Sequence, residues 1–114
     1  MVLDGEGRGS QLLRGVLDMC LLALICEEPS YGYEMVRKLE ERGLQLVGEG
    51  SIYPLLSRLQ RHGLIEAYAM PSTEGPARKY YRATAAGRTT LDSWLADWQT
   101  FARGVDRVVK GGSG

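Results

Sequence analysis

The segment GSIYPLLSRLQRHG, residues 50–63, predicts a short amphipathic helix around which the rest of the chain is organised. Its four apolar residues recur at i, i+3, i+4 and i+7, which is the spacing of one face of an α-helix. Gly50 and Ser51 mark the start, where the Ser51 hydroxyl can cap the helix, and Pro54 is tolerated only in a first turn. Gly63 is the residue type that ends a helix in a left-handed conformation. The apolar face comprises Ile52, Leu55, Leu56 and Leu59.

The other face of this predicted helix carries hydroxyls and arginines, which can contact phosphates or base edges. The exposed residues would be Ser51, Tyr53, Pro54, Ser57, Arg58 and Arg61. Taken alone, this pattern fits an ordinary surface helix better than a DNA recognition helix, so the neighbouring segments have to decide between them.

Two helices are predicted before this stretch. Residues 11–28 form the first, which is apolar on nearly every side and must therefore be covered on most sides, if necessary by a second chain. Pro29 ends it. The second helix spans about residues 31–42, with Ser30 as a plausible N-cap and Gly43 as its end. A helix, a short connector and a further helix are typical of a helix-turn-helix.

After Gly63 the apolar period changes from 3.6 to 2. Residues 64–70 and 78–84 are predicted strands, joined by a seven-residue loop, 71–77, that consists of turn-forming residues. The return strand carries three basic residues. A basic hairpin directly after the candidate recognition helix indicates a wing.

The last predicted helix spans residues 85–110, with Thr84 as its N-cap. It would be about 39 Å long, which exceeds the width of so small a domain. Its apolar residues alternate steps of four and three, which is the heptad spacing of a helix that packs on another helix. We therefore expect an obligate homodimer, in which the first helix forms the other wall of the interface. The expected interface residues are Leu13, Leu17, Leu91, Leu95, Trp98, Ala102, Val105 and Val109.

Bulk composition is that of an ordinary globular protein of 114 residues with a formal net charge of zero, large enough for one domain. The charge is unevenly distributed. Residues 50–88 contain six basic and two acidic residues, a local surplus of four, which suits phosphate binding. The acids gather elsewhere, at Glu27, Glu28, Glu34, Glu40, Glu41 and Glu49.

The remaining features favour a cytoplasmic protein. Cys20 and Cys26 would lie about 9 Å apart along one helix and on different faces, so we expect free, buried thiols. No signal peptide is visible, and no apolar run reaches the roughly 18 residues of a membrane span. Residues 1–10 are expected to be a flexible arm and residues 111–114 a disordered tail, so the DNA-binding domain would span residues 11–84.

Seven short motifs occur in order over roughly the N-terminal 70% of the chain: LRGVLD at 13–18, YGYE at 31–34, GSIYP at 50–54, RL at 58–59, GLI at 63–65, KYY at 79–81 and TAAG at 84–87. With these motifs the sequence resembles the PadR family of bacterial transcriptional regulators. The single short helix after the wing resembles the smaller subclass of the family, which dimerises through that helix. Departures are mild: Gln60 stands where the family usually has an acid, and Pro76 and Ala77 replace a glycine and a basic residue in the wing loop.

The resemblance implies a mainly α-helical fold with a small β-hairpin, a winged helix-turn-helix that binds duplex DNA. Arg58 would read a base and Arg61 would sit on a phosphate, while the wing would grip the backbone across the minor groove. Backbone N–H groups of Tyr31 and Gly32 would face a phosphate. For the tyrosines, core packing with the hydroxyl outward is the alternative, and for the wing a solvated hairpin. The expected DNA contacts are Tyr31, Gly32, Ser51, Tyr53, Pro54, Ser57, Arg58, Arg61, Arg78 and Lys79.

A second expected site lies on the last helix, where Trp94 and Trp98 face one way at i, i+4. They are either plain core or, as the resemblance implies, the lining of a cavity between subunits in which a flat apolar ligand stacks. Met19 and Phe101 would join that lining. Ligand binding would change the spacing of the two recognition helices and release DNA.

Enzyme chemistry finds little support in the sequence. His62 is the single histidine, and no Ser/His/Asp set, metal-spaced Cys/His group or phosphate loop is present, so we expect no catalytic residue, metal or cofactor. The expected function is a homodimeric regulator, a repressor, on an inverted-repeat operator. The alternative is a winged-helix protein–protein interaction module without specific DNA binding, which strong salt dependence of DNA affinity would exclude.

Overall fold

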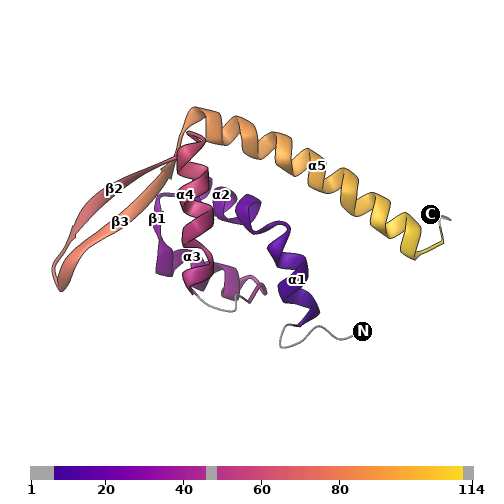
Figure 1. The fold of residues 1–114 in the computed structure, drawn as a ribbon, viewed down its shortest axis with the longest axis horizontal. Coiled ribbons are helices and arrows are strands. Elements are labelled where there is room, and N and C mark those ends of the chain that lie inside the picture. Colours follow the sequence, from indigo (N-terminus) through magenta and orange to yellow (C-terminus); the bar gives the residue numbers. More distant parts are fainter. Residues whose placement is uncertain (1–6, 46–48, 112–114) are drawn as a thin grey trace.

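The computed structural model describes residues 7–45 and 49–111, which form five α-helices, one 3₁₀ turn and three strands (Figure 1). The fold is mainly helical, with a small antiparallel sheet and a long C-terminal helix, as predicted. The elements are α1 (Arg8–Arg14), α2 (Leu17–Glu27), β1 (Ser30–Tyr31), α3 (Gly32–Glu41), η1 (Glu49–Ser51), α4 (Tyr53–Arg61), β2 (Ile65–Ser72), β3 (Gly75–Ala83) and α5 (Ala85–Val109).

The predicted first helix is wrong as a single helix, because α1 and α2 meet at an angle of 69°. Gly15 and Val16 donate their N–H groups to Leu12 and Leu13, three residues back instead of four, which tightens and ends α1. Glycine is also a poor helix former. The helix begins at Arg8, so the arm predicted for residues 1–10 is too long by three residues, and residues 1–6 lie outside the described part.

The core forms around α2, whose Leu21, Leu22 and Ile25 are completely buried. From α3, Met35 packs against them, and Ile52 does so immediately before α4. The apolar face predicted for α4 is confirmed: Ile52, Leu56 and Leu59 are buried and Leu55 is half-buried. One face of α4 is therefore committed to the core, and only the opposite face is available to a ligand.

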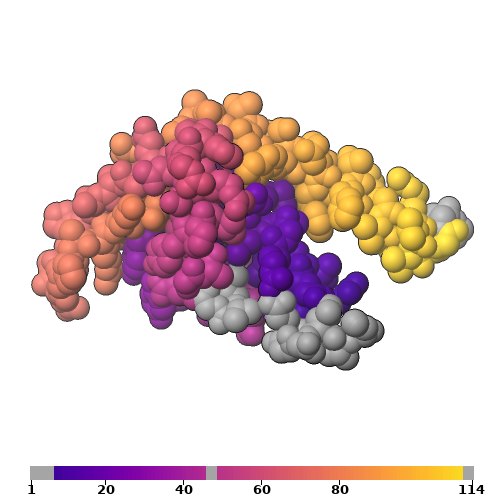
Figure 2. All heavy atoms as spheres, viewed as in Figure 1, coloured from indigo at the N-terminus to yellow at the C-terminus, as the bar shows by residue number. Residues whose placement is uncertain are grey.

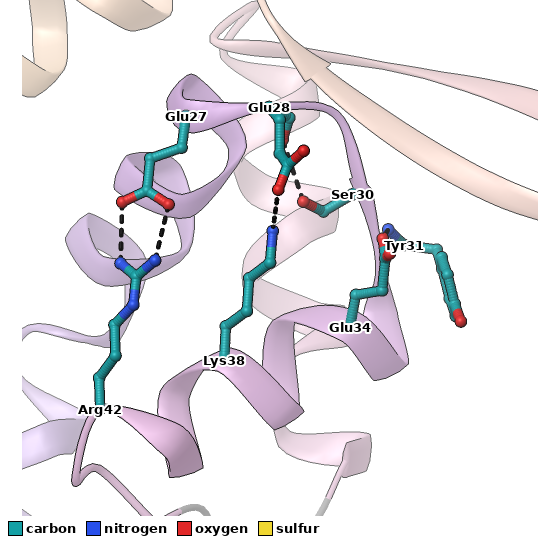
Figure 3. A network of polar contacts seen from close by, with 7 residues as sticks. All are labelled: Glu27, Glu28, Ser30, Tyr31, Glu34, Lys38 and Arg42. Carbon is teal, nitrogen blue, oxygen red and sulfur yellow. Dashed lines mark hydrogen bonds and ion pairs between the residues drawn. The ribbon is translucent and has the colours of Figure 1, made fainter.

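Ion pairs connect the C-terminus of α2 to the outer side of α3 (Figure 3). The two terminal nitrogens of Arg42, Nη1 and Nη2, donate to the two carboxylate oxygens of Glu27 at 2.8 Å, and Lys38 Nζ donates to Glu28 at 2.8 Å. The Arg42 bond holds the pKa of Glu27 below its ordinary value. Exposed pairs of this kind each contribute little stability, but the bidentate geometry fixes an orientation. These contacts help set the angle between α2 and α3.

The predicted cap of α3 at Ser30 is wrong. Ser30 is buried in β1, where its hydroxyl donates to the Glu28 carbonyl at 3.0 Å, and Tyr31 is the N-cap (Figure 3). The Tyr31 N–H donates to Glu34 Oε1 at 3.1 Å, a bond from the third helical residue back to the cap. The prediction missed β1 because two residues are too few to show a strand period.

Both predicted glycine stops are confirmed, at Gly43 (φ 94°) and Gly63 (φ 74°). After each glycine the next N–H bonds the carbonyl five residues earlier, from Leu44 at 2.8 Å and from Leu64 at 3.0 Å. The predicted start of α4 shifts slightly, because Ile52 rather than Ser51 is the N-cap and its apolar side chain cannot cap. Pro54 lies in the first turn, as predicted.

The sheet has the strand order β1-β3-β2, all antiparallel. The predicted seven-residue wing loop is wrong, since β2 continues to Ser72 and β3 begins at Gly75. Pro71 is accommodated at a register shift between Met70 and Ser72 on an edge strand, where a missing N–H is tolerated. The wing is therefore longer and more regular than its turn-rich sequence predicts.

The start of α5 is fixed by Thr84, the predicted N-cap. Its hydroxyl accepts the Gly87 N–H at 3.0 Å and donates to the Gly63 carbonyl at 2.7 Å, so one side chain connects the end of α4 to the start of α5. Gly87 lies directly against the Leu64 carbonyl, where any Cβ would overlap the backbone. This contact places the long helix at a fixed angle to the winged domain.

The single chain is extended. Its radius of gyration is 16.2 Å, whereas a compact chain of this length would have about 13 Å. The cause is α5, whose C-terminal half projects from the body with no other element packed around it in Figures 1 and 2. No single described helix is long and apolar enough to span a membrane, although the bent pair α1 and α2 reaches that length and composition together.

Candidate nucleic-acid interface

Three elements that are distant in sequence meet at one shallow pocket of about 250 Å³. They are the start of α3, the segment that leads into α4, and the return strand of the wing. The wing lies on the opposite side of α4 from the free end of α5 (Figure 1). Five of the ten predicted DNA contacts line this pocket. Its lining is Tyr31, Gly32, Tyr33, Glu49, Tyr53, Arg78, Lys79 and Tyr81.

The solvent face of α4 carries the other predicted contacts. Neither Arg58 nor Arg61 pairs with an acid within residues 7–45 and 49–111, so both guanidinium groups are available to phosphates or base edges. Their spacing from Tyr53, five and eight residues, keeps all three on one side of the helix. The exposed residues here are Ser51, Tyr53, Pro54, Ser57, Arg58 and Arg61, as predicted.

Tyr53 lies across the start of α3, against Gly32. A Cβ on Gly32 would come within 2.5 Å of the Tyr53 hydroxyl oxygen, so a larger residue there would force the Tyr53 side chain to move. The hydroxyl donates to Glu49 Oε2 at 2.7 Å, and this bond, with partial burial, raises the pKa of Tyr53 to about 12. Tyr53 therefore remains a neutral hydroxyl at any physiological pH.

Three residues that line the pocket, Tyr33, Glu49 and Tyr81, are not among the predicted contacts, and Glu49 is the charged one of the three. The sequence places Glu49 with the acids outside the basic region, but in the structure it lines the same pocket as Arg78 and Lys79. The available signal was its position four residues before Tyr53, a spacing that brings two side chains together on a helical turn. The negative charge of a glutamate repels phosphates, so the sequence gives no reason to place Glu49 in a DNA-binding surface.

The role predicted for the Tyr31 backbone needs correction. Its N–H is bonded to Glu34 and is not available to a phosphate. The side chain has a different role: the Tyr31 hydroxyl accepts a hydrogen bond from Arg78 Nη1 at 3.1 Å, and the guanidinium lies 4.7 Å from the ring centroid. Tyr80 packs edge-on against the same ring. Tyr31 thus holds a wing arginine in place from the neighbouring helix.

Part of the basic surplus that the sequence shows is already engaged inside the chain. Arg82 Nε donates to Glu66 at 3.1 Å, and its guanidinium stacks over Tyr68. Arg88 donates to the Cys26 carbonyl at 3.1 Å, at the end of α2. Lys79 remains beside the pocket with its ammonium 5.8 Å from the Tyr81 ring. The available cations are accordingly those of α4 and the outer wing.

The predicted interface residues of the first helix lie elsewhere than expected. Leu13 and Leu17 are each only 5% exposed within the single chain, so they have little surface left for a partner. Leu12, by contrast, is 64% exposed. Because the helix breaks at Gly15, α1 directs its apolar residues differently from a continuous helix, and Leu12 rather than Leu13 faces solvent.

The predicted seam on α5 divides into two parts. Leu91 and Trp94 are half-buried against the core of the chain, and Ala102 is half-buried further along. The remaining large residues are exposed, and the Trp98 and Phe101 rings lie 6.5 Å apart. Met19 is half-buried on α2. The exposed apolar residues of α5 are Leu95, Trp98, Phe101, Val105, Val108 and Val109.

In the part of the chain that the structure describes, no three His, Cys, Asp or Glu side chains are placed to hold a metal ion. Cys20 and Cys26 are free thiols, half-buried rather than fully buried, and burial raises the pKa of both.

Comparison with known proteins gives a consistent result. The profile of the Transcriptional regulator PadR-like family matches residues 21–93. A transcriptional regulator of Mycobacterium tuberculosis is 32% identical over 92 residues, which cover 81% of this chain and 84% of that protein. A PadR-like transcriptional regulator from Bacillus cereus shares 43% identity with a TM-score of 0.76, over 88% of this chain and 97% of its own. A PadR family transcriptional regulator from Eggerthella lenta shares 33% identity with a TM-score of 0.78, over 87% and 86%.

Proposed function

Because the chain belongs to the PadR-like family of transcriptional regulators, we propose that it is a cytoplasmic repressor that binds an inverted-repeat DNA operator as a homodimer. The observation that supports this most strongly is the shared pocket. It joins the start of α3, the segment leading into α4 and the wing into one surface with unpaired cations around it. A protein–protein module would have no need for this combination.

In this proposal α4 enters the major groove. Arg58 contacts a base edge, for which the guanine O6 and N7 acceptors are the best match, and Ser57 and Tyr53 contact neighbouring groups. Arg61, in the last turn of α4, contacts a phosphate. Arg78 and Lys79 contact the backbone across the adjacent minor groove, with Arg78 already held in position by Tyr31. These phosphate contacts fix the register on DNA, and α4 supplies the sequence preference.

The homodimer is proposed from the exposed surface of α5. Leu95, Trp98 and Val105 are each at least 40% exposed in the single chain and lie on one side of the helix. A continuous apolar stripe of this kind is typical of a helix that packs against another. The stripe, together with Leu12 of α1, would be covered by the same elements of a second copy. Twofold symmetry would then present α4 twice and require an inverted repeat.

We also propose a small apolar or aromatic effector between the two α5 helices. The exposed Trp98 and Phe101 rings offer flat surfaces for stacking. Trp94, one turn earlier on α5, and Met19, on α2, are half-buried and would complete the lining. A ligand there would alter the separation of the two α4 helices and release the operator. Tryptophan fluorescence, followed while flat apolar compounds are titrated, would change at concentrations that also weaken operator binding.

The test of the proposed function is Arg58→Ala. Operator affinity should fall by about 1–3 kcal/mol and the sequence preference should relax at one base pair, because Arg58 reads a base. Arg103→Ala on α5 is the matched control and should leave affinity unchanged. Binding should also weaken by orders of magnitude between low and moderate salt. Equal affinity of the Arg58→Ala and wild-type proteins, or salt-independent binding, would contradict the proposal.

A further inference from the structure

The pocket between α3, α4 and the wing contains a charge of the wrong sign for a DNA-binding surface. Of the eight residues that line it, Arg78 and Lys79 are basic and Glu49 alone is acidic. A phosphate that approaches these cations must also approach the Glu49 carboxylate. An acid at this position therefore weakens phosphate binding unless it contributes to recognition in another way.

Glu49 differs from the surface acids that form ion pairs, because its partner is a neutral hydroxyl. Glu27, Glu28, Glu41 and Glu66 each pair with an arginine or lysine at 2.8–3.4 Å. For Glu49 no basic partner is found among the described residues, and its carboxylate instead accepts the neutral Tyr53 hydroxyl at 2.7 Å. Its negative charge is therefore not held in an ion pair, and it acts on whatever enters the pocket.

The same hydrogen bond fixes a residue of the proposed reading surface. Tyr53 is 44% exposed, and a side chain at such a position is free to change rotamer unless something holds it. Two contacts do so here: the ring lies against Gly32, and the hydroxyl is bonded to Glu49. Glu49 thus places the Tyr53 ring at the start of α4, where the helix would meet the bases.

From these contacts, and resting on the proposed DNA-binding function, we propose that Glu49 is a specificity-determining residue that disfavours DNA of arbitrary sequence. Binding to arbitrary DNA comes almost entirely from phosphates, so a carboxylate in the pocket opposes it directly. Operator binding suffers the same repulsion, but gains from a Tyr53 side chain that is already in place. The ratio of the two affinities therefore rises because of Glu49.

The experiment uses the full chain and two duplexes of equal length, one selected by the wild-type protein from a random pool and one scrambled. Affinities are measured by fluorescence anisotropy over a range of salt for the wild type, Glu49→Gln, Glu49→Ala and the control Glu40→Gln. Glutamine keeps an acceptor for the Tyr53 hydroxyl but removes the charge. Glu40 is an exposed acid about 12 Å along α3 from the pocket, so its replacement changes the net charge equally.

We expect Glu49→Gln to raise affinity for the scrambled duplex about three- to tenfold and to steepen its salt dependence by up to about one unit of slope. Operator affinity should rise less, so the specificity ratio falls. Glu49→Ala should have lower operator affinity than Glu49→Gln. In a Tyr53→Phe background that difference should vanish, because the hydroxyl that distinguishes them is gone.

A specificity ratio for Glu49→Gln equal to that of Glu40→Gln would overturn the inference. So would a loss of operator affinity in Glu49→Gln with no change on scrambled DNA, because Glu49 would then be a base contact. Neither result would contradict the proposed DNA-binding function. That function would be contradicted separately if the wild-type protein selected no duplex and bound none at low salt.

Discussion

At the scale of the residue, Gly32 and Tyr53 show how the contact surface is constructed. The first residue of α3 has no side chain, and this absence lets an aromatic ring from the start of α4 lie directly on it. Tyr31, one residue earlier, uses its ring and hydroxyl to hold Arg78 of the wing. Two consecutive residues therefore connect α3 with both of the other elements that form the pocket.

Gly32→Ala should weaken operator binding by up to about tenfold, because the new Cβ displaces the Tyr53 ring and breaks its hydrogen bond to Glu49, which contributes about 0.5–1.5 kcal/mol. Gly50→Ala is the matched control, since a Cβ there meets no atom within 4 Å. Anisotropy titrations of both variants with one operator duplex would measure the difference. If the two variants bind equally, the Tyr53 ring does not depend on Gly32.

A site residue can be predicted from the sequence when a local helical or strand period places it, and not when its role depends on contacts with another segment. The exposed face of α4 and the arginine positions of the wing are visible in the sequence, because helical and strand periods place them. Glu49 was not, since its role depends on a hydrogen bond across one turn. The use of the Tyr31 side chain depends on pairing between β1 and β3, residues 31 and 80, which no local pattern shows.

At the scale of the element, the orientation of α5 depends on its first turn. Thr84 connects the end of α4 to the start of α5, and Gly87 allows the helix backbone to touch the Leu64 carbonyl. The first strand of the wing, β2, begins at Ile65, immediately after Leu64. A single junction thus sets the angles between the recognition helix, the wing and the helix proposed to dimerise.

Two Gly→Ala substitutions within α5 should have opposite effects. Gly87→Ala should lower the free energy of unfolding by about 1–3 kcal/mol, because the Cβ overlaps backbone that cannot move aside. Gly104→Ala should raise it by about 0.5–1 kcal/mol, since a Cβ there meets nothing within 4 Å and alanine favours helix. Urea denaturation of both variants would measure this. Destabilisation by Gly104→Ala would place another chain against that side of the helix.

The elements themselves were largely predictable, and the exceptions have physical causes. Helices α3, α4 and α5 have amphipathic periods and glycine or threonine ends, and these were placed within a few residues. The break between α1 and α2 was missed, because a lone glycine in an apolar run is usually tolerated in a helix. The wing turn was predicted too long, since Pro71 and Pro76 suggested a loop but an edge strand can contain them.

At the scale of the whole molecule, the chain has more apolar surface than one domain can cover. The winged domain encloses its own core, whereas the C-terminal half of α5 stands free of it (Figure 2). A second copy would cover this helix and place two α4 helices in a symmetric arrangement. Dimerisation and DNA recognition would then depend on each other, because one chain alone would contact only half of an operator.

Leu95→Glu should convert the dimer to a monomer and reduce operator affinity at least tenfold, because a charge would be buried in the seam. Thr100→Glu adds the same charge on the opposite side of α5 and should leave both properties unchanged. Sedimentation equilibrium gives the mass and anisotropy gives the affinity. A Leu95→Glu protein that remains dimeric would show that α5 does not form the interface.

In the proposed complex, two copies of the surface formed by α3, α4 and the wing read one DNA site. Selection from a random duplex pool, followed by hydroxyl-radical footprinting of the winning sequence, would show whether they do. We expect an inverted repeat whose half-site centres are about 10–10.5 base pairs, or a multiple of that distance, apart, with each half protected equally. Recovery of no common sequence, or protection of a single site without symmetry, would contradict this proposal.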